Sequence, residues 1–369
     1  MRKVWMASDC VVSPLGFTST ENYQNIRNGL SGIEQVEDFQ LSPTPVHVAQ
    51  FQQVDVPELT TRFEFICQQA IDGLFQQTPL NKEKTLFILA TTKGNINLLD
   101  SGVHQPGIHL HETASKVCRY AGLAHHLVIS NACISGVLAL IVAKRYLENG
   151  KYDHALVVGA DVLSKFIVSG FQSLMALSSE ACKPFDAERQ GINLGEAAGA
   201  MLLTANPDEL KIKPTVRLSG SGLTNDANHI SGPSRTGEEL SLAVNCAIKE
   251  AGIQAHEVDF ISAHGTGTLY NDEMEAKAFH HAGLQHVPLH SLKGNFGHTL
   301  GAAGVVETVM SLHGLQHNEI LPTKGYQRSG VSKPVTISQR LEKRPLQTCL
   351  KTASGFGGCN AAIILQKEN

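Results

Sequence analysis

The sequence predicts an α/β protein, because short strand-like runs alternate with helical patterns along the whole chain. β-Branched and apolar runs of strand length recur at 3–12, 85–91, 126–130, 154–159, 199–204, 215–223, 260–263, 335–338 and 361–366. Helical patterns separate many of them, at 62–75, 113–121, 135–149, 238–251, 272–282 and 302–317. Such alternation favours mainly parallel sheets with helices on both faces.

A polar stretch at 205–214, which contains two prolines, is the only plausible break in the chain. It divides the chain into 1–205 and 206–369, and the two halves echo each other. In each half a strand leads through a short motif into an apolar helix, Asn-Ala-Cys in the first and Lys-Gly-Asn-Phe-Gly-His in the second. This indicates an internal duplication, although ordinary α/β alternation would give the same pattern about as readily.

The composition indicates a soluble cytoplasmic protein. The chain has 369 residues, which allow a large core, and a net charge of −4, which gives no sign of nucleic-acid binding. Its longest strongly apolar run, 137–143, is far shorter than the roughly 20 residues of a membrane helix. Asp9 lies where a signal peptide would need apolar residues. The 8 cysteines contain no CxxC pair, which favours a reducing compartment.

Cys133 lies between a predicted strand and an apolar helix, in the stretch Ser-Asn-Ala-Cys (130–133). The start of a helix lowers the pKa of a thiol, which favours the nucleophilic thiolate. The free N–H groups there can also stabilise a tetrahedral oxyanion. A buried structural cysteine is the more common role, but Ala132, Ser135 and Gly136 leave room for a substrate. The position therefore predicts a nucleophile.

His264 follows a short apolar strand and begins the stretch His-Gly-Thr-Gly-Thr (264–268). Ligands of α/β sheets bind beyond the carboxyl ends of strands. The glycines allow close approach of a ligand, and the hydroxyls of Thr266 and Thr268 can hydrogen-bond amides. The alternative is a surface-loop histidine. A phosphate-binding loop is disfavoured, because neither GxGxxG nor GxxxxGK[ST] is matched.

His298 precedes a tightly packable, apolar helix start and mirrors Cys133 in the second half. Lys293 lies five residues upstream, and Glu307 interrupts an otherwise nearly apolar stretch. A carboxylate in such a place needs a cationic partner, which Lys293 or His298 would provide. A solvated helix face is the alternative.

Phe356 is surrounded by three glycines in Gly-Phe-Gly-Gly (355–358). This pattern indicates a flexible turn that carries a bulky gate, with an ordinary glycine-rich turn as the alternative. A metal site is not expected, because His104, His109 and His111 share a loop without the spacing of zinc ligands. A serine hydrolase is disfavoured, because no GxSxG elbow accompanies a triad.

Together these stretches resemble the elongating, decarboxylating β-ketoacyl-acyl carrier protein synthases of the thiolase superfamily. The resemblance covers nearly the whole chain and adds the motifs 183–186 (Lys-Pro-Phe-Asp) and 195–199 (Gly-Glu-Ala-Ala-Gly). One cysteine with two histidines and a lysine separates it from the initiating synthases, which resemble Cys–His–Asn. It implies a duplicated, thiolase-like αβαβα fold of five layers, whose halves would be 1–205, with the cysteine, and 206–369, with both histidines and the lysine.

The resemblance also implies a decarboxylative Claisen condensation. Cys133 would take an acyl group, and His264 and His298 would stabilise the enolate formed from malonyl-carrier protein. The resemblance assigns the remaining roles as follows: Lys293 with Glu307 would position the site, the N–H groups of Cys133 and Phe356 would hold the oxyanion, Phe356 would gate the acyl pocket, and Thr266, Thr268 and Gly357 would contact phosphopantetheine. No metal or bound cofactor is implied, because phosphopantetheine arrives on the carrier protein.

The implied partners are an acyl carrier protein and a second chain, in a homodimer or in a heterodimer with a related synthase-like chain. The pathway would be fatty acid, polyketide or aryl-polyene-type synthesis. The alternative is a non-catalytic partner resembling a chain-length factor, although such partners usually lack the cysteine. Compared with the family, 92–113 is short, Ser354 replaces an aromatic residue, Cys359 replaces threonine, and the early basic cluster around Arg62 is thin. These differences leave the acyl substrate and the carrier-docking surface open.

Overall fold

The computed structural model describes residues 2–52, 54–76, 82–101, 107–227 and 230–368. The strands are β1 Trp5–Val12, β2 Ile33–Val36, β3 Val46–Ala49, β4 Thr85–Ala90, β5 His125–Ile129, β6 His154–Asp161, β7 Leu194–Gly195, β8 Ala197–Thr204, β9 Val216–Asn225, β10 Phe260–Ser262, β11 Leu289–His290, β12 Glu319–Ile320, β13 Glu342–Lys343, β14 Thr348–Gly355 and β15 Cys359–Lys367. The α-helices are α1 Ser19–Arg27, α2 Arg62–Phe75, α3 Leu110–Tyr120, α4 Ser135–Glu148, α5 Lys165–Ser173, α6 Glu238–Ala251, α7 Leu269–His281, α8 Lys293–Phe296 and α9 Ala303–His317.

The main sheet consists of two five-stranded parts with the same topology. Its strand order is β11-β10-β14-β15-β9-β1-β8-β6-β4-β5. The first part has the order β1-β8-β6-β4-β5 and the second has the order β9-β15-β14-β10-β11. If the strands of each part are numbered along the chain, both orders read 1-5-4-2-3. The parts join through a single register pair, Trp5 with Arg217. This repeat supports an internal duplication, and a border near residue 205, between β8 and β9, stays our proposal.

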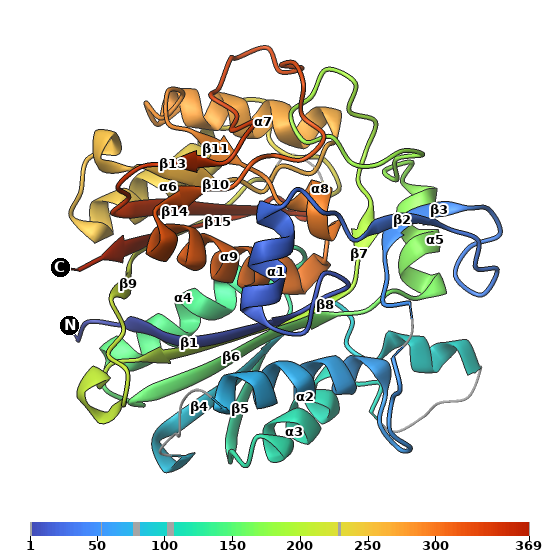
Figure 1. Cartoon of the computed structure of the whole chain (residues 1–369), viewed down its shortest axis with the longest axis vertical. Coiled ribbons are helices and arrows are strands. Elements are labelled where there is room, and N and C mark those ends of the chain that lie inside the picture. The colour runs from blue at the N-terminus through green and yellow to red at the C-terminus, as the bar shows by residue number, and fades with distance from the viewer. Residues whose placement is uncertain (1, 53, 77–81, 102–106, 228–229, 369) are drawn as a thin grey trace.

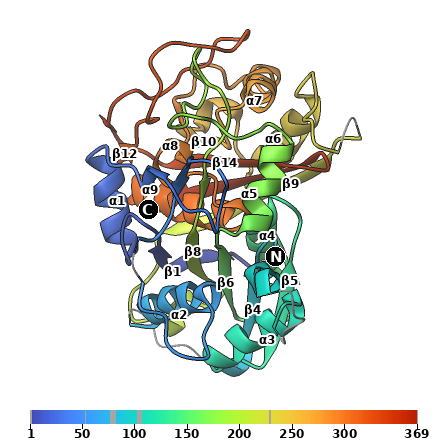
Figure 2. The ribbon, with the colours of Figure 1, turned by 90° about the vertical axis from the view of Figure 1, so that its right-hand side faces the viewer.

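The two parts of the sheet and the helices form five layers. In Figure 1, α6 and α7 lie above one part of the sheet, α4 and α9 lie between the two parts, and α2 and α3 lie below the other. Figure 2 shows the same layers from the side. The contacts agree, because α4 and α9 each touch strands of both parts, whereas α2 and α6 each pack on one. The predicted five-layer α/β fold is therefore confirmed.

The two central helices cross with their backbones in close contact. A Cβ atom on Gly136 of α4 would lie 2.7 Å from the backbone nitrogen of Val305, and one on Gly304 of α9 would lie 2.3 Å from that of Val137. The core-facing residues of both helices are mainly apolar, because both sheet parts cover them. The crossing places the starts of α4 and α9 side by side, and these starts follow Cys133 and His298.

Two details of the predicted fold are wrong. The sheet is mixed rather than mainly parallel: β4 runs parallel to β5 and β6, whereas β8 runs antiparallel to both β1 and β6. The run 335–338 is not a strand, since Ile337 forms only an isolated bridge to Leu289. The strand next to β10 is instead β14, which the sequence concealed because buried polar residues, including Lys351 and Thr352, interrupt its apolar pattern.

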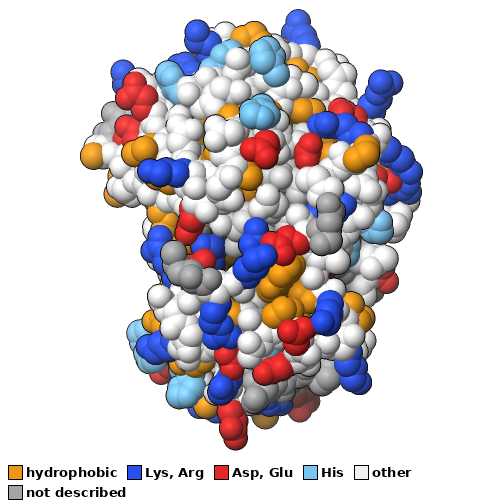
Figure 3. All heavy atoms as spheres, turned by 90° about the vertical axis from the view of Figure 1, so that its left-hand side faces the viewer, with side chains coloured by type: hydrophobic (Ala, Val, Ile, Leu, Met, Phe, Trp, Pro, Cys, Tyr) orange, Lys and Arg blue, Asp and Glu red, His pale blue; other side chains and the backbone are white. Residues whose placement is uncertain are grey.

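The surface carries charges of both signs. On the face in Figure 3, lysine and arginine side chains are interspersed with aspartate and glutamate. That face therefore offers no continuous basic area of the kind that nucleic acids require. Within the described residues, no helix combines the length and apolar character that crossing a bilayer would need.

Candidate active site

Cys133 lies in a tight turn between β5 and α4. The turn is closed by Ser135, whose Oγ accepts from the Asn131 N–H at 2.8 Å and donates to the Ala132 carbonyl at 2.6 Å. Ala132 has a φ of 44°, a left-handed conformation that costs a non-glycine residue of order 1 kcal/mol. The surrounding structure holds this strained turn, which places the Cys133 thiol in a cavity while leaving the residue only 7% exposed.

The Cys133 thiol is protonated at neutral pH in this structure. Burial raises its pKa to about 12, and the charge of Lys293 and the backbone N–H of Phe356, which both favour the thiolate, do not offset this. The prediction of a lowered thiol pKa is therefore wrong here, because desolvation outweighs the helix start. Formation of the thiolate must accompany a later event, such as proton transfer to a base.

His264 and His298 lie beside Cys133, although they come from different elements. His264 follows β10, and His298 lies in the loop between α8 and α9. Their rings are 5.2 Å apart and nearly perpendicular, at 82°. The Cys133 sulfur and one ring nitrogen of each histidine all lie within 4.8 Å of one another. The structure thus brings together the three groups that the sequence had placed in separate motifs.

Both imidazoles are neutral at pH 7. Burial lowers the pKa of His264 and of His298 well below the usual value, and the positive charges of Lys293 and Lys351 lower both further. A neutral imidazole has one N–H donor and one acceptor nitrogen. Nδ1 of His298 has no hydrogen-bond partner among the described residues. Each ring can therefore donate a hydrogen bond to a negative oxygen.

Lys293 and Glu307 form the predicted pair behind the histidines. Lys293 Nζ contacts Glu307 Oε1 and also donates to the His264 carbonyl oxygen at 3.0 Å. Burial acts to raise the pKa of Glu307, but Lys293 and a second lysine, Lys351, outweigh it, so the pKa is lowered. Both residues of the pair are almost completely buried. The pair therefore fixes the turn at His264 from behind.

Lys351 and Glu275 are the residues of this site that sequence reasoning missed. Lys351 Nζ lies 2.6 Å from Glu307 Oε2, and the residue is fully buried in β14. Glu275 of α7 accepts from the backbone N–H groups of His264 and Gly265, at 2.8 and 2.6 Å. The available signal was a lone lysine in the otherwise strand-like run 348–353.

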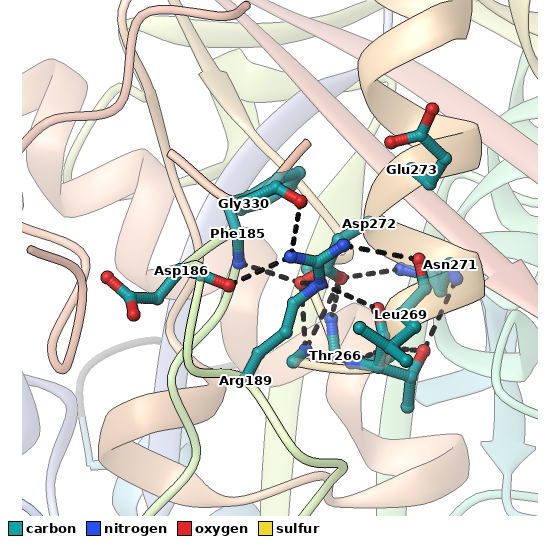
Figure 4. Close-up of polar contacts among 12 residues, drawn as sticks. Phe185, Asp186, Arg189, Thr266, Leu269, Asn271, Asp272, Glu273 and Gly330 are labelled. Carbon is teal, nitrogen blue, oxygen red and sulfur yellow. Dashed lines mark hydrogen bonds and ion pairs between the residues drawn. The ribbon is translucent and has the colours of Figure 1, made fainter. Parts of the chain in front are cut away.

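A second polar network holds the turn that contains Thr266 and Thr268 (Figure 4). The Asp272 carboxylate accepts from the backbone N–H groups of Phe185, at 2.7 Å, and of Thr266, at 2.9 Å. The Arg189 guanidinium donates to the carbonyl oxygens of Thr268, at 3.3 Å, and of Leu269, at 3.4 Å. The two threonine hydroxyls lie 2.9 Å apart. This network presents both threonines to the cavity.

The reacting groups line a cavity of about 380 Å³. Its lining includes Cys133, His264, Thr266, Thr268, His298 and Phe356. Phe356 is 39% exposed and stacks on Phe171 of α5, with ring centroids 5.8 Å apart. Gly357 does not line the cavity, and its N–H donates to the Ile230 carbonyl at 2.6 Å. Its substrate-binding role stays a prediction.

Ser354 and Cys359, two positions at which the sequence differs from the family pattern, lie close to the site. Ser354 lines the cavity, and its hydroxyl donates to Asn360 Oδ1 at 2.8 Å. The Cys359 thiol lies 3.4 Å from the carbonyl oxygen of Phe356. Within the short segment 92–113, residues 102–106, and with them His104, lie outside the described part of the chain.

One thiol and two imidazoles at this spacing also suit zinc in principle. The ammonium groups of Lys293 and Lys351 act on both histidines and disfavour a cation between the rings, although Glu307 pairs with both lysines. The arrangement suits negative charge instead. It can stabilise an oxyanion or enolate next to a sulfur nucleophile.

Comparison with known proteins places these residues in a family. Residues 119–209 match "Beta-ketoacyl synthase, N-terminal domain" and 216–327 match "Beta-ketoacyl synthase, C-terminal domain". The 3-oxoacyl-[acyl-carrier-protein] synthase 2 of Rhizobium meliloti is 32% identical over 66% of this chain and 61% of that protein. The putative polyketide beta-ketoacyl synthase 1 of Streptomyces halstedii is 30% identical over 64% of this chain and 59% of that protein. The matches thus span about three fifths of these two relatives.

Solved structures agree over the whole chain. A ketosynthase in complex with its chain length factor from Xenorhabdus doucetiae has a TM-score of 0.88 and 28% identity, and the match covers 100% of this chain and 98% of that one. A beta-ketoacyl synthase from Burkholderia phymatum has a TM-score of 0.89 at 22% identity, covering all of both chains, which supports the fold alone.

Proposed function

Because the chain belongs to the β-ketoacyl synthase family, we propose that it catalyses the decarboxylative Claisen condensation of an acyl group with malonyl-carrier protein. The observation that carries this proposal is the meeting of Cys133, His264 and His298 within 4.8 Å in one cavity. The product is a β-ketoacyl-carrier protein in fatty acid, polyketide or aryl-polyene-type synthesis.

The first step is acyl transfer to Cys133. The sulfur attacks the thioester carbonyl of an acyl-carrier protein, the new S–C bond forms, and the C–S bond to the carrier breaks. The thiol proton passes through a neighbouring imidazole to the departing carrier thiol. The backbone N–H groups of Cys133 and Phe356 hold the oxyanion, and the contact of the Phe356 N–H with the Cys133 sulfur supports this role.

The second step is decarboxylation of the malonyl thioester. Its carbonyl oxygen accepts hydrogen bonds from His264 and His298, the C–C bond to the carboxylate breaks, and carbon dioxide leaves with the electron pair retained in an enolate. The enolate carbon attacks the acyl carbon on Cys133, and the sulfur departs as the new C–C bond forms. Neutral imidazoles suit this role, because they donate hydrogen bonds without protonating the enolate carbon.

The substrates arrive on carrier proteins through phosphopantetheine arms, so the chain needs no metal and no bound organic cofactor of its own. Thr266, Thr268 and Gly357 contact the arm, and the acyl chain lies beyond Phe356. The protein works in the cytoplasm as a homodimer, or as a heterodimer with a related synthase-like chain. The relative from Xenorhabdus doucetiae, a ketosynthase in complex with its chain length factor, supports the second arrangement.

The same relative supports a second candidate function, that of a non-catalytic partner resembling a chain length factor. The assembled trio of Cys133, His264 and His298 favours the catalytic function, because a partner without turnover has no need of it. Activity of the purified chain alone separates the two. An active chain supports catalysis, whereas activity only in a heterodimer whose partner carries the nucleophile supports the second function.

Cys133→Ala tests the proposal directly. The purified protein is incubated with acyl-carrier protein and examined by intact mass, and condensation with malonyl-carrier protein is then measured. Wild type gains the mass of the acyl group and forms product, whereas Cys133→Ala does neither. Cys246→Ala, which removes an exposed thiol from α6, is the matched control and behaves as wild type. Condensation at the wild-type rate by Cys133→Ala would refute the proposal.

A further inference from the structure

Lys351 is a fully buried lysine whose ammonium group lies behind the two histidines. Its Nζ contacts Glu307 Oε2 at 2.6 Å and donates to the Thr352 carbonyl at 2.7 Å. It also reaches the carbonyl oxygens of Ser262, at 3.3 Å, and Ala263, at 3.4 Å. These two carbonyls belong to the last residues before His264. Lys351 thus connects β14 to the segment that carries one of the reacting imidazoles.

The charges around Lys351 alternate and balance. Lys293 pairs with Glu307, and Glu307 pairs in turn with Lys351. The charge of Lys351 also acts on Glu275, to whose carboxylate the adjacent Thr352 hydroxyl donates at 3.0 Å. Two ammonium groups therefore face two carboxylates with no net charge. Such balance is required because an unpaired charge in this buried position would cost several kcal/mol.

Three of these side chains fix five backbone atoms around His264, and Glu307 holds the two lysines among them. Lys351 binds the carbonyls of Ser262 and Ala263, and Lys293 binds that of His264. Glu275 accepts from the N–H groups of His264 and Gly265. Lys293 connects Glu307 to the turn at His264, and Lys351 connects Glu307 to the two residues before that turn, so removal of Lys351 would free the carbonyls of Ser262 and Ala263 from this group.

We propose that Lys351 is a positioning residue for the decarboxylation step, acting through the turn at His264 and through its charge on both imidazoles. The inference rests on the proposed function, because decarboxylation is the step that it concerns. Lys351 does not line the cavity and so does not touch substrate. Burial is the main cause of the neutral form of the two histidines, and the positive charge of Lys351 lowers their pKa further.

Besides Lys351, the ionisable groups beside the two imidazoles are Cys133 before α4, Glu275 of α7, Lys293 of α8 and Glu307 of α9. His298 also lowers the pKa of His264. Among the groups that lower the pKa of both histidines, only Lys293 and Lys351 are cations. Removing the Lys351 charge leaves Lys293 alone in that role.

The test compares Lys351→Met with Lys144→Met. Lys144 is another buried lysine, and it pairs with Glu148 and Glu250 near the far end of α4. Its loss therefore removes a similar ion pair that is remote from the site. We expect Lys351→Met to slow carbon dioxide release from malonyl-carrier protein about tenfold at pH 7. The acid limb of its pH–rate profile should shift to higher pH by about one pH unit, because the histidine pKa rises when the positive charge is removed. Lys144→Met should lose stability without moving the limb.

Two further measurements keep the test decisive. Titration of the His264 ring by NMR, with its signal identified from its loss in His264→Gln, reads the same pKa rise without any turnover. If Lys351→Met folds poorly, Lys351→Gln removes the charge but keeps a polar group that can donate to a carbonyl oxygen, and it should fold better while showing the same shift of the acid limb.

The outcomes for the inference and for the proposed function are distinct. An unchanged limb and an unchanged His264 titration in Lys351→Met, or an equal shift in Lys144→Met, would overturn the role of Lys351. Wild type that releases no carbon dioxide would count against the proposed function instead, while the NMR titration would still test Lys351.

Discussion

Gly136 and Gly304 let the two central helices touch through their backbones. A side chain on either glycine would meet main-chain atoms of the other helix at 2.3–2.9 Å. The relative placement of Cys133 and His298 therefore depends on two positions at which no methyl group fits.

Gly136→Ala should impair both folding and activity. Its Cβ would push α4 away from α9, at a cost of roughly 1–3 kcal/mol in the free energy of unfolding. Displacement of about 1 Å between Cys133 and the histidines should lower the condensation rate by up to ~100-fold. Denaturant unfolding and a condensation assay measure the two effects. Gly170→Ala on α5, where a Cβ meets nothing within 4 Å, should match wild type.

Alkylation of Cys133 should accelerate with pH far beyond neutrality. Because burial raises its pKa to about 12, the thiolate fraction should grow about tenfold per pH unit between pH 7 and pH 10. The rate with iodoacetamide, followed by mass spectrometry of the Cys133 peptide, measures this dependence. An alkylation rate that stops rising by pH 8 would mean that the helix start lowers the thiol pKa by more than burial raises it.

His264→Ala and His298→Ala should separate the two half-reactions. Each removes a donor to the enolate oxygen, so carbon dioxide release should fall by roughly 10²–10³. Acyl transfer to Cys133 should be less affected, because backbone N–H groups hold its oxyanion and the remaining imidazole can still accept the thiol proton. Radiolabelled malonyl-carrier protein and intact mass report the two steps. His256→Ala, which alters an exposed histidine, serves as the control. Equal loss of both steps would argue against this division of roles.

Phe356→Ala should change which acyl chains are accepted. The substitution removes the ring that stacks on Phe171 but keeps the backbone N–H, so bulkier acyl groups should react faster relative to short ones. Competition among acyl-carrier proteins of different chain length measures this preference. Phe166→Ala removes an exposed ring from the same helix as Phe171 and should leave the preference unchanged.

The parts of the site that the sequence made predictable share one property, namely a distinctive local pattern. Cys133, His264 and His298 each stand in a glycine- or serine-rich turn beside an apolar run, and these turns meet in the structure. Lys351 has no such pattern. It interrupts the apolar pattern of β14, and its contacts with Ser262 and Ala263 form because β14 pairs with β10. Contacts made across a sheet depend on strand order, which local periodicity does not encode.

The thiol pKa shows a different limit. The position of Cys133 at a helix start was predictable, but the extent of its burial depends on the glycine turn at 355–358 and on α9, both from the other half of the chain. The charge state of a group is set by everything that packs around it. The mixed sheet was missed for a related reason, because strand direction follows from connections rather than from composition.

The repeated strand order has a consequence for how the reaction is divided along the chain. The sulfur belongs to one repeat, and both imidazoles, Lys293 and Lys351 belong to the other, with the two sheet parts joined by a single register pair. Neither repeat alone contains a complete set of reacting groups. A polypeptide of one repeat would need to associate with a second, differently specialised copy to do this chemistry. Covalent linkage of the two repeats fixes their ratio at one to one and makes their association independent of protein concentration.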